Sequence, residues 1–130
     1  MASSTRMDID TIFRVIKGSL PEYGAGLVKD CMSVYGFDLK TDTGSVQYTL
    51  DLSQGQGSVE KGLRPAVNAV LKTTDHYLED FFLGRATLRE LYSSGKLKMD
   101  GSVGRITRLR LSSFPPFTAE SVRKYAAPRL

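Results

Sequence analysis

The sequence predicts an α+β domain in which helices cover one face of a five-stranded, mainly antiparallel sheet. Apolar residues recur at helical spacing up to about residue 31, alternate at strand spacing from residue 34 to residue 71, and then return mainly to helical spacing. Strands that are grouped together and followed by helices are typical of this fold class. The length of 130 residues, with 41% apolar and 25% charged residues, suits one domain with a packed core.

The first part of the chain predicts two helices separated by a proline. An apolar stripe begins after Asp8 or Asp10, each a suitable N-cap, and runs to Leu20. Pro21 interrupts the stripe, but proline is well tolerated in the first turn of a new helix. The second helix then runs to about Cys31.

The middle of the chain predicts four strands. Two alternating runs, 34–40 and 46–52, flank a short loop that contains glycine, which indicates an antiparallel hairpin. A glycine-rich turn precedes a short third strand at 58–60. The less regular alternation of residues 65–71 predicts the fourth strand.

The next segment predicts two helices and the fifth strand. One of residues 73–75 is expected to cap a helix that runs to Gly84. A second helix follows, in which the leucines and the tyrosine of segment 88–92 share one face because they are spaced by three and one. Residues 96–99 alternate lysine with an apolar residue and predict the strand.

A last helical stripe consists of Val103, Ile106 and Leu109. Pro115-Pro116 ends this region, because proline breaks helices and restricts the residue before it. Residues 119–126 form either a short helix or a loose tail.

Basic residues are concentrated toward the C-terminus. The net charge is +4, but residues 105–130 contain six basic residues and one acid, a net of +5, which leaves −1 for residues 1–104. Such a segment suits an anionic membrane surface, an acidic head group, a nucleic acid or a protein receptor, and a solvated helix face is the alternative interpretation. Few aromatic residues accompany these charges, so we do not expect nucleic acid to be a partner.

The sequence contains little that suggests catalysis or metal binding. Cys31 is the only cysteine and His76 the only histidine. A nucleophilic Cys31–His76 pair is one hypothesis, and a structural cysteine with a surface histidine is the alternative. We expect no metal, because potential ligands are not clustered in the sequence. A single cysteine excludes an intrachain disulfide, and no apolar run approaches the roughly 20 residues that span a bilayer.

The helices carry many apolar residues for so small a sheet. Singly, each is best interpreted as ordinary core, whereas together they suggest a cavity between the sheet and the helices. The candidate lining residues are Phe13, Ile16, Leu20, Tyr48, Leu50, Phe81, Phe82, Leu88, Leu91, Tyr92, Leu97, Met99, Ile106, Leu109, Phe114 and Phe117.

A glycine pattern in the second half of the chain resembles that of a known family. Gly84 is followed eleven residues later by Gly-Lys-Leu-Lys at 95–98 and then by Gly101. This spacing resembles the signature of the sterol carrier protein 2 family, also called the non-specific lipid-transfer proteins. Residues 51–59 are similar to the family's second strand and the turn after it, and residues 28–37 to its second helix and first strand.

The resemblance covers about residues 8–112 and implies both a fold and a function. It implies a sheet covered by helices, with an apolar tunnel for fatty acids, fatty acyl-CoA, sterols or phospholipids. The implied function is that of a lipid carrier, not an enzyme, that needs no cofactor and contacts membranes transiently. An accessory lipid-binding scaffold and an acyl-CoA thioesterase built on the cysteine–histidine pair are the alternatives. An unpaired charge is costly inside an apolar tunnel, so we expect an anionic head group at the mouth, near Arg105, Arg108 or Arg110.

The C-terminal tripeptide Pro128-Arg129-Leu130 resembles the peroxisomal Ser-Lys-Leu signal, because it has a basic middle residue and a terminal leucine. We therefore expect a peroxisomal import receptor as a partner and a location in the peroxisomal matrix or a related organelle, and otherwise in the cytoplasm. The predicted organisation is a flexible N-terminus at 1–7, a lipid-binding domain at 8–112 and a C-terminal tail at 113–130 that carries the signal.

Overall fold

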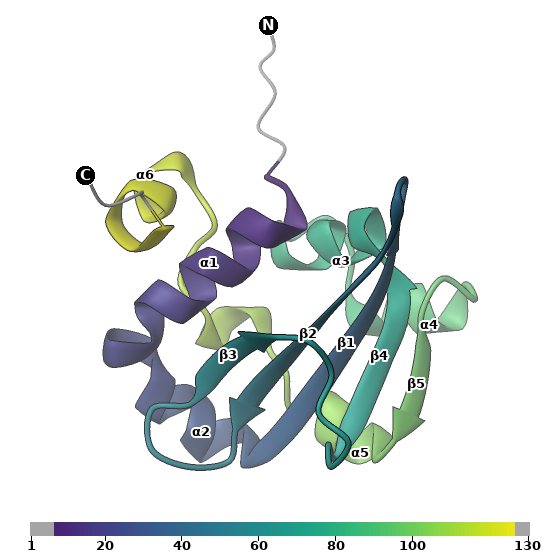
Figure 1. Cartoon of the computed structure of the whole chain (residues 1–130), viewed down its shortest axis with the longest axis horizontal. Coiled ribbons are helices and arrows are strands. Elements are labelled where there is room, and N and C mark those ends of the chain that lie inside the picture. The colour runs from purple at the N-terminus through teal and green to yellow at the C-terminus, as the bar shows by residue number, and fades with distance from the viewer. Residues whose placement is uncertain (1–6, 127–130) are drawn as a thin grey trace, which may run out of the picture.

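The sheet of the computed structural model, which describes residues 7–126, has its strands in the order β3-β2-β1-β4-β5 (Figure 1). β1 and β4 run parallel, and the other three neighbouring pairs are antiparallel. The prediction of a five-stranded, mainly antiparallel sheet is therefore confirmed. In spatial order the strands are β3 (Ser58–Lys61), β2 (Gly44–Leu52), β1 (Ser33–Thr41), β4 (Ala69–Thr74) and β5 (Lys98–Gly101).

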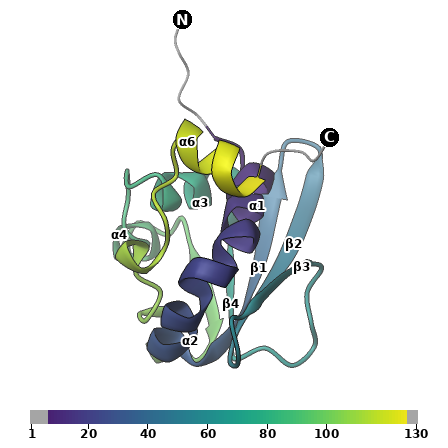
Figure 2. The same cartoon turned by 90° about the vertical axis from the view of Figure 1, so that its left-hand side faces the viewer.

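The helices cover one face of the sheet (Figure 2). Among residues 7–126, no helix is both long enough and apolar enough to cross a bilayer. The helical elements are α1 (Ile9–Ser19), the π-helical η1 (Leu20–Gly24), α2 (Ala25–Cys31), α3 (Asp75–Phe82), α4 (Leu88–Ser93), α5 (Val103–Ile106), the 3₁₀-helical η2 (Leu111–Ser113), α6 (Ala119–Ser121) and the π-helical η3 (Val122–Ala126).

The N-terminal helices start and stop as their sequence predicts. The Asp8 side chain accepts a hydrogen bond from the backbone N–H of Thr11 at 2.8 Å and caps α1. Pro21 lies in the first turn of η1, so the chain passes from α1 into a π-helical turn without losing its helical course. α2 ends at Met32, whose φ of 48° is left-handed.

The hairpin of β1 and β2 forms the centre of the sheet. Phe37 pairs with Tyr48 and Tyr35 with Leu50, so the alternating apolar residues of both strands lie on the face that the helices cover. The predicted antiparallel hairpin is therefore confirmed, and each strand extends slightly beyond the predicted run.

β4 lies about four residues later than its predicted position. The loop before it is closed by Asn68, whose backbone N–H donates to the Val34 carbonyl and whose side chain accepts from the Val34 N–H. The strand then continues to Thr74, because Thr73 and Thr74 extend the pairing with β1. Thr74 also caps α3, as one of the three predicted N-cap residues.

β5 begins two residues later than predicted. The backbone N–H groups of Lys96 and Leu97 donate to the Leu91 carbonyl at 2.8 and 3.1 Å, so they end α4 and are not available to the sheet. Leu97 is nevertheless buried, and Lys96 and Lys98 are exposed as their alternation predicts.

The predicted helix over 103–109 was wrong in length, because α5 ends after one turn, at Ile106. The N–H groups of Arg108 and Leu109 donate to carbonyls three residues earlier. The apolar residues at 103, 106 and 109 repeat every three residues, which is the period of 3₁₀ turns and differs from that of an α-helix.

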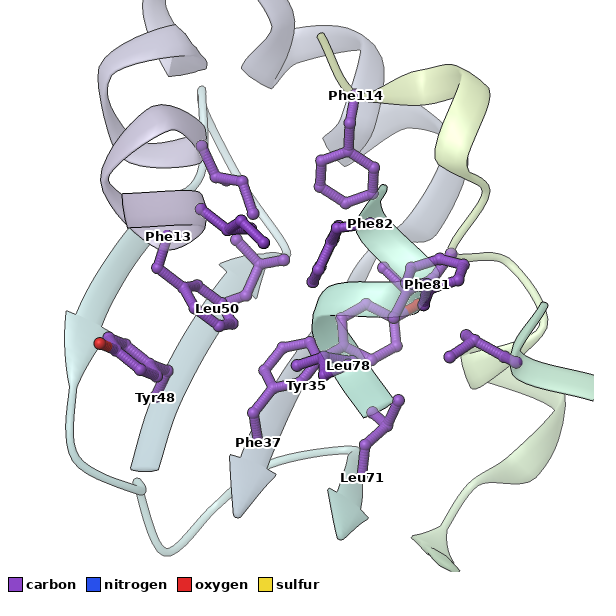
Figure 3. Close-up of a cluster of buried hydrophobic side chains, with 14 of the residues drawn as sticks. Phe13, Tyr35, Phe37, Tyr48, Leu50, Leu71, Leu78, Phe81, Phe82 and Phe114 are labelled. Carbon is purple, nitrogen blue, oxygen red and sulfur yellow. The ribbon is translucent and has the colours of Figure 1, made fainter. Parts of the chain in front are cut away.

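One continuous cluster of buried side chains lies between the helices and the sheet, and Phe13 of α1 belongs to it (Figure 3). Its ring stacks on Tyr48 with centroids 4.1 Å apart and meets Phe37 and Phe82 edge-on at 5.2 and 6.1 Å. Burial raises the pKa of Tyr48, whose hydroxyl donates to Asp10 at 2.7 Å.

Residues 119–126 are helical, which decides between the two predicted alternatives. η3 packs across α1 at Gly18, where a Cβ would collide with the backbone carbonyl of Tyr125. The Tyr125 hydroxyl donates to the Glu22 carboxylate at 2.8 Å and thereby lowers the pKa of Glu22. This part of the C-terminal segment is therefore packed on the domain.

Two predicted features lie wholly or partly outside the described residues. The targeting tripeptide Pro128-Arg129-Leu130 lies outside them, as do residues 1–6 of the predicted N-terminal segment. Met7, the last residue of that segment, packs against the core. The predicted domain boundaries stay a prediction.

Candidate binding cavity

A cavity of about 730 Å³ lies beside α4, β5 and α5, the elements grouped at one end of the sheet in Figure 1. The end of α3, its connection to α4 and the chain after α5 complete the walls. Most of the lining side chains are apolar. The lining residues are Phe81, Gly84, Arg85, Ala86, Thr87, Leu88, Arg89, Glu90, Tyr92, Met99, Val103, Ile106, Thr107, Leu109 and Leu111.

α4 is placed by a capping box at its first turn. The Thr87 hydroxyl accepts from the Glu90 N–H at 3.0 Å, and the Glu90 carboxylate accepts from the Thr87 N–H at 2.8 Å. Leu88 and Leu91 are buried as predicted, whereas Tyr92 is 52% exposed. Tyr92 still lines the cavity, so the predicted apolar face of this helix is divided between core and cavity.

α5 is fastened to the body of the domain by hydrogen bonds to its backbone and from its arginine. The Tyr35 hydroxyl donates to the Arg105 carbonyl at 2.6 Å, and burial raises the pKa of Tyr35, which keeps this donor protonated. The Arg105 guanidinium donates to the Met32 carbonyl at 3.1 Å and to the Ser33 hydroxyl at 2.9 Å. These bonds hold the wall that carries Ile106.

The structure divides the sixteen predicted lining residues into three groups. Six line the cavity, namely Phe81, Leu88, Tyr92, Met99, Ile106 and Leu109. Three line a second groove, namely Phe82, Phe114 and Phe117. Seven line neither and belong to the buried core, namely Phe13, Ile16, Leu20, Tyr48, Leu50, Leu91 and Leu97.

The second groove has a volume of about 660 Å³ and lies along the proline-containing segment after η2. Pro115 and Pro116 contribute to its wall. Leu111 lines both the cavity and the groove, so the two spaces are neighbours at this side chain.

Two arginines that the sequence did not single out belong to the cavity. Arg85 and Arg89 line it, whereas Arg105, Arg108 and Arg110 do not. The guanidinium groups of Arg105 and Arg108 are directed to carbonyl oxygens at the end of α2. The proposed head-group role of those three arginines stays a prediction. The only hint in the sequence was that Arg85 and Arg89 follow Gly84, the first glycine of the family signature, within five residues.

Cys31 and His76 are not brought together. Figures 1 and 2 both place α2 and α3 at opposite ends of the domain. The Cys31 thiol donates to the Arg108 carbonyl at 3.5 Å, and burial raises its pKa, which disfavours a thiolate. The geometry therefore gives no support to a cysteine–histidine catalytic pair.

One group of potential metal ligands is formed at the start of α3, where the sequence showed no clustering. Asp75, His76 and Glu79 each offer one potential ligand atom, and these three atoms lie within 4.8 Å of one another. His76 Nδ1 lies 3.3 Å from Glu79 Oε1, a hydrogen-bonding arrangement that supplies the buried carboxylate with a partner from the protein itself.

The fold and the cavity together are those of a small ligand-binding domain, in which a sheet covered by helices borders a mainly apolar cavity at one end. Residues 14–110 match the model of the SCP-2 sterol transfer family. The chain belongs to this family, so the predicted resemblance is confirmed.

Two curated relatives show how much of a longer protein this chain matches. It is 31% identical over 99 residues to peroxisomal multifunctional enzyme A of Dictyostelium discoideum, covering 75% of this chain and 22% of that protein. It is 26% identical over 111 residues to sterol carrier protein 2 of Gallus gallus, covering 84% of this chain and 20% of that protein. The chain thus spans about a fifth of the length of these relatives.

Solved structures share the fold. Sterol carrier protein 2 from Yarrowia lipolytica, in its apo form, has a TM-score of 0.65 at 29% identity, covering 72% of this chain and 80% of that one. Sterol carrier protein 2 from Aedes aegypti in complex with palmitate has a TM-score of 0.60 at 18% identity, covering 84% of this chain and 100% of that one. The second likeness shows the fold alone.

Proposed function

We propose that this domain carries a lipid with one long apolar chain in the cavity beside α4, β5 and α5. The observation that carries the proposal is the cavity itself, because its 730 Å³ falls within the range of about 300–1,000 Å³ that is usual for ligand sites. Its walls are mainly apolar, so the lipid chain would replace water against them. Solved structures of the same fold from Aedes aegypti contain palmitate, which supports a fatty acyl chain as the cargo.

The energy available from the cavity is sufficient for tight binding. Burial of a CH₂ group contributes about 0.8 kcal/mol, so a chain of about 16 carbons gains on the order of 10 kcal/mol before the costs of association. The six predicted residues that line the cavity are the proposed contacts. A chain that extends past Leu111 would enter the second groove, where Phe82, Phe114 and Phe117 form the wall.

Filling the cavity tests this proposal. Val103 lines it and is 45% exposed, so Val103→Trp adds bulk to the cavity without disturbing the core. We expect the Kd for a fluorescent fatty acid to rise at least about tenfold, since the added ring takes volume from several CH₂ groups. Met32→Trp is the matched control, because Met32 is 63% exposed and does not line the cavity. Equal affinities of the two variants would place the lipid elsewhere.

An accessory scaffold that binds lipid without transferring it is the second candidate function. Transfer of a fluorescent fatty acid between donor and acceptor vesicles distinguishes the two. A carrier accelerates transfer in proportion to its concentration, whereas a scaffold binds the lipid but leaves the rate at that of spontaneous exchange.

We further propose that the domain acts in peroxisomes. The Dictyostelium discoideum relative is named as a peroxisomal enzyme, which supports this location. A fluorescent protein fused in front of residue 1 should colocalise with a peroxisomal marker and become diffuse when Leu130 is deleted. A diffuse signal from the undeleted fusion would contradict the proposal.

A further inference from the structure

The charged residues of the cavity are confined to one stretch of its wall. Arg85, Arg89 and Glu90 all belong to the connection before α4 or to α4 itself. The wall formed by β5, α5 and the residues after α5 contributes apolar side chains and one threonine. The cavity therefore has one wall that carries charges and one that carries none, here called its polar end and its apolar end, which is the pattern expected for an amphiphile.

The two arginines at the polar end are free to meet a ligand. Glu90 is engaged in the capping box of α4, where its carboxylate accepts from the Thr87 N–H. Arg85 Nη1 lies 3.7 Å from Asp80, and both side chains are substantially exposed, so this pair is weak and open to competition. The Arg89 side chain is exposed, and its guanidinium forms no ion pair or hydrogen bond within residues 7–126.

The buried polar side chains around the cavity offer no competing partner for a ligand charge. Every buried side-chain nitrogen and oxygen within residues 7–126 already has a hydrogen-bond partner. A charged group that entered the apolar end would therefore be left unpaired, at a large cost in desolvation. A ligand charge is thus directed to the end that carries Arg85 and Arg89.

We propose that Arg85 and Arg89 bind the anionic head group, a carboxylate or a phosphate, of a single-chain lipid. This inference rests on the proposed function. Guanidinium groups bind carboxylate and phosphate oxygens with paired, charge-assisted hydrogen bonds, so two of them at one end select an anion over a hydroxyl. The apolar chain lies against Met99, Val103 and Ile106, with its tail toward Leu111.

A double variant separates the head-group contact from the chain contact. Arg85→Gln/Arg89→Gln removes both charges but keeps side chains that favour a helix. The probes are palmitate and 1-hexadecanol, which share a chain of the same length and differ in head-group charge. We expect the Kd for palmitate to rise about tenfold or more and that for hexadecanol to stay within about twofold.

The control variant, Lys40→Gln/Arg123→Gln, removes the same charge from two exposed basic residues that do not line the cavity. It should leave both Kd values within about twofold of the original. Raising the salt concentration should weaken palmitate binding to the original protein and leave hexadecanol binding nearly constant, because only the charged contact is screened. Hexadecyl phosphate in a third arm distinguishes a phosphate from a carboxylate head group.

Two results would overturn the assignment while leaving the carrier proposal intact. The first is an equal loss of palmitate and hexadecanol binding in the Arg85/Arg89 variant, and the second is no loss of either. If the original protein bound neither probe, the carrier proposal itself would fail. Hexadecanol binding also reports whether the variant is folded, so a misfolded protein cannot imitate the expected result.

Discussion

The two ends of this domain are built from similar apolar residues but differ in how completely they are filled. At one end, here called the filled end, α1 lies on the hairpin and the Phe13 ring is stacked on Tyr48 and surrounded by further rings. At the other, the cavity end, α4, β5 and α5 surround a space of about 730 Å³. The same kind of side chain therefore stabilises the fold at one end and is available to a ligand at the other.

The length of the elements explains the difference. α1 has eleven residues, and its buried stripe covers the hairpin, which has nine residues in each strand. α4 has six residues, and α5 and β5 have four each. A helix of one turn buries few side chains, so the cavity end cannot reach the packing density of a normal core. A binding space can thus result from short elements without any special residue.

The largest expected effect is the loss of stability in Phe13→Ala. Removing a fully buried phenylalanine costs about 3–5 kcal/mol, because it leaves a cavity where none existed. Met99→Ala at the cavity end should cost only about 1 kcal/mol, since Met99 is half-buried and already faces an open space. Urea unfolding of both variants gives the two free energies of unfolding.

The same pair should show the opposite order in lipid binding. Met99→Ala should weaken fatty-acid binding, whereas Phe13→Ala should leave the Kd of the folded fraction unchanged, because Phe13 does not line the cavity. Phe13→Leu is the milder substitute if the alanine variant does not fold. Equal losses of stability at Phe13 and Met99 would show that the two ends are packed alike.

The sequence predicted the filled end better than the cavity end. The hairpin could be predicted to within two residues at each strand end, because the alternation of apolar residues marks both strands. The cap residues Asp8 and Thr74 were among the predicted candidates, since capping depends only on residues within one turn. The limits of β4 depend on Asn68 bonding to Val34, a contact across the sheet that no local pattern reveals.

The lining of the cavity is hidden from the sequence for a related reason. Leu88 and Leu91 are both buried leucines on α4, yet only Leu88 lines the cavity. Which of them does so depends on where α5 lies, and α5 is held by Tyr35, far away in the chain. Arg89 is on the surface whether or not a cavity lies beside it, so its position on a polar helix face says nothing about a head group.

An intermediate loss of stability is expected when the contact between α1 and η3 at the filled end is loosened. Gly18→Ala places a Cβ against the Tyr125 carbonyl, so α1 and η3 must separate at a cost of about 1–3 kcal/mol. Gly26→Ala in α2 meets no atom within 4 Å and should instead stabilise the protein by about 0.5–1 kcal/mol. Thermal unfolding measures both.

Limited proteolysis locates the effect of Gly18→Ala. Trypsin should cleave after Arg123 and Lys124 faster than in the original protein, because η3 is released from α1. Fatty-acid binding should be unchanged, since Tyr125 does not line the cavity. Equal Tm values for the two glycine variants would show that the C-terminal helix contributes nothing to the filled end.

The smallest expected effect on stability comes from a charged side chain, because the charged groups of the two ends differ in their hydrogen bonds. Beside the hairpin, the Asp51 carboxylate accepts from Arg64 Nη1 at 2.7 Å and from the Ser53 N–H at 2.9 Å. Burial alone would raise the pKa of Asp51, but the hydrogen bonds from Ser53 and Arg64 outweigh it and lower that pKa below its ordinary 3.8. Arg89, at the cavity end, has no such carboxylate within residues 7–126.

The direction of this shift determines the pH dependence. The folded-state pKa of Asp51 is below the unfolded value, so its stabilisation is fully present above about pH 4 and is lost as the pH falls through the folded pKa. Asp51→Asn should therefore lower the free energy of unfolding by about 1 kcal/mol at pH 7 and flatten its dependence on pH below 4. Asp42→Asn, on an exposed turn, should change neither. If both variants kept the original dependence of stability on acid pH, Asp51 would not be the group whose protonation weakens the filled end. The hydrogen bonds between Asp51 and Arg64 would then not distinguish the filled end from the cavity end.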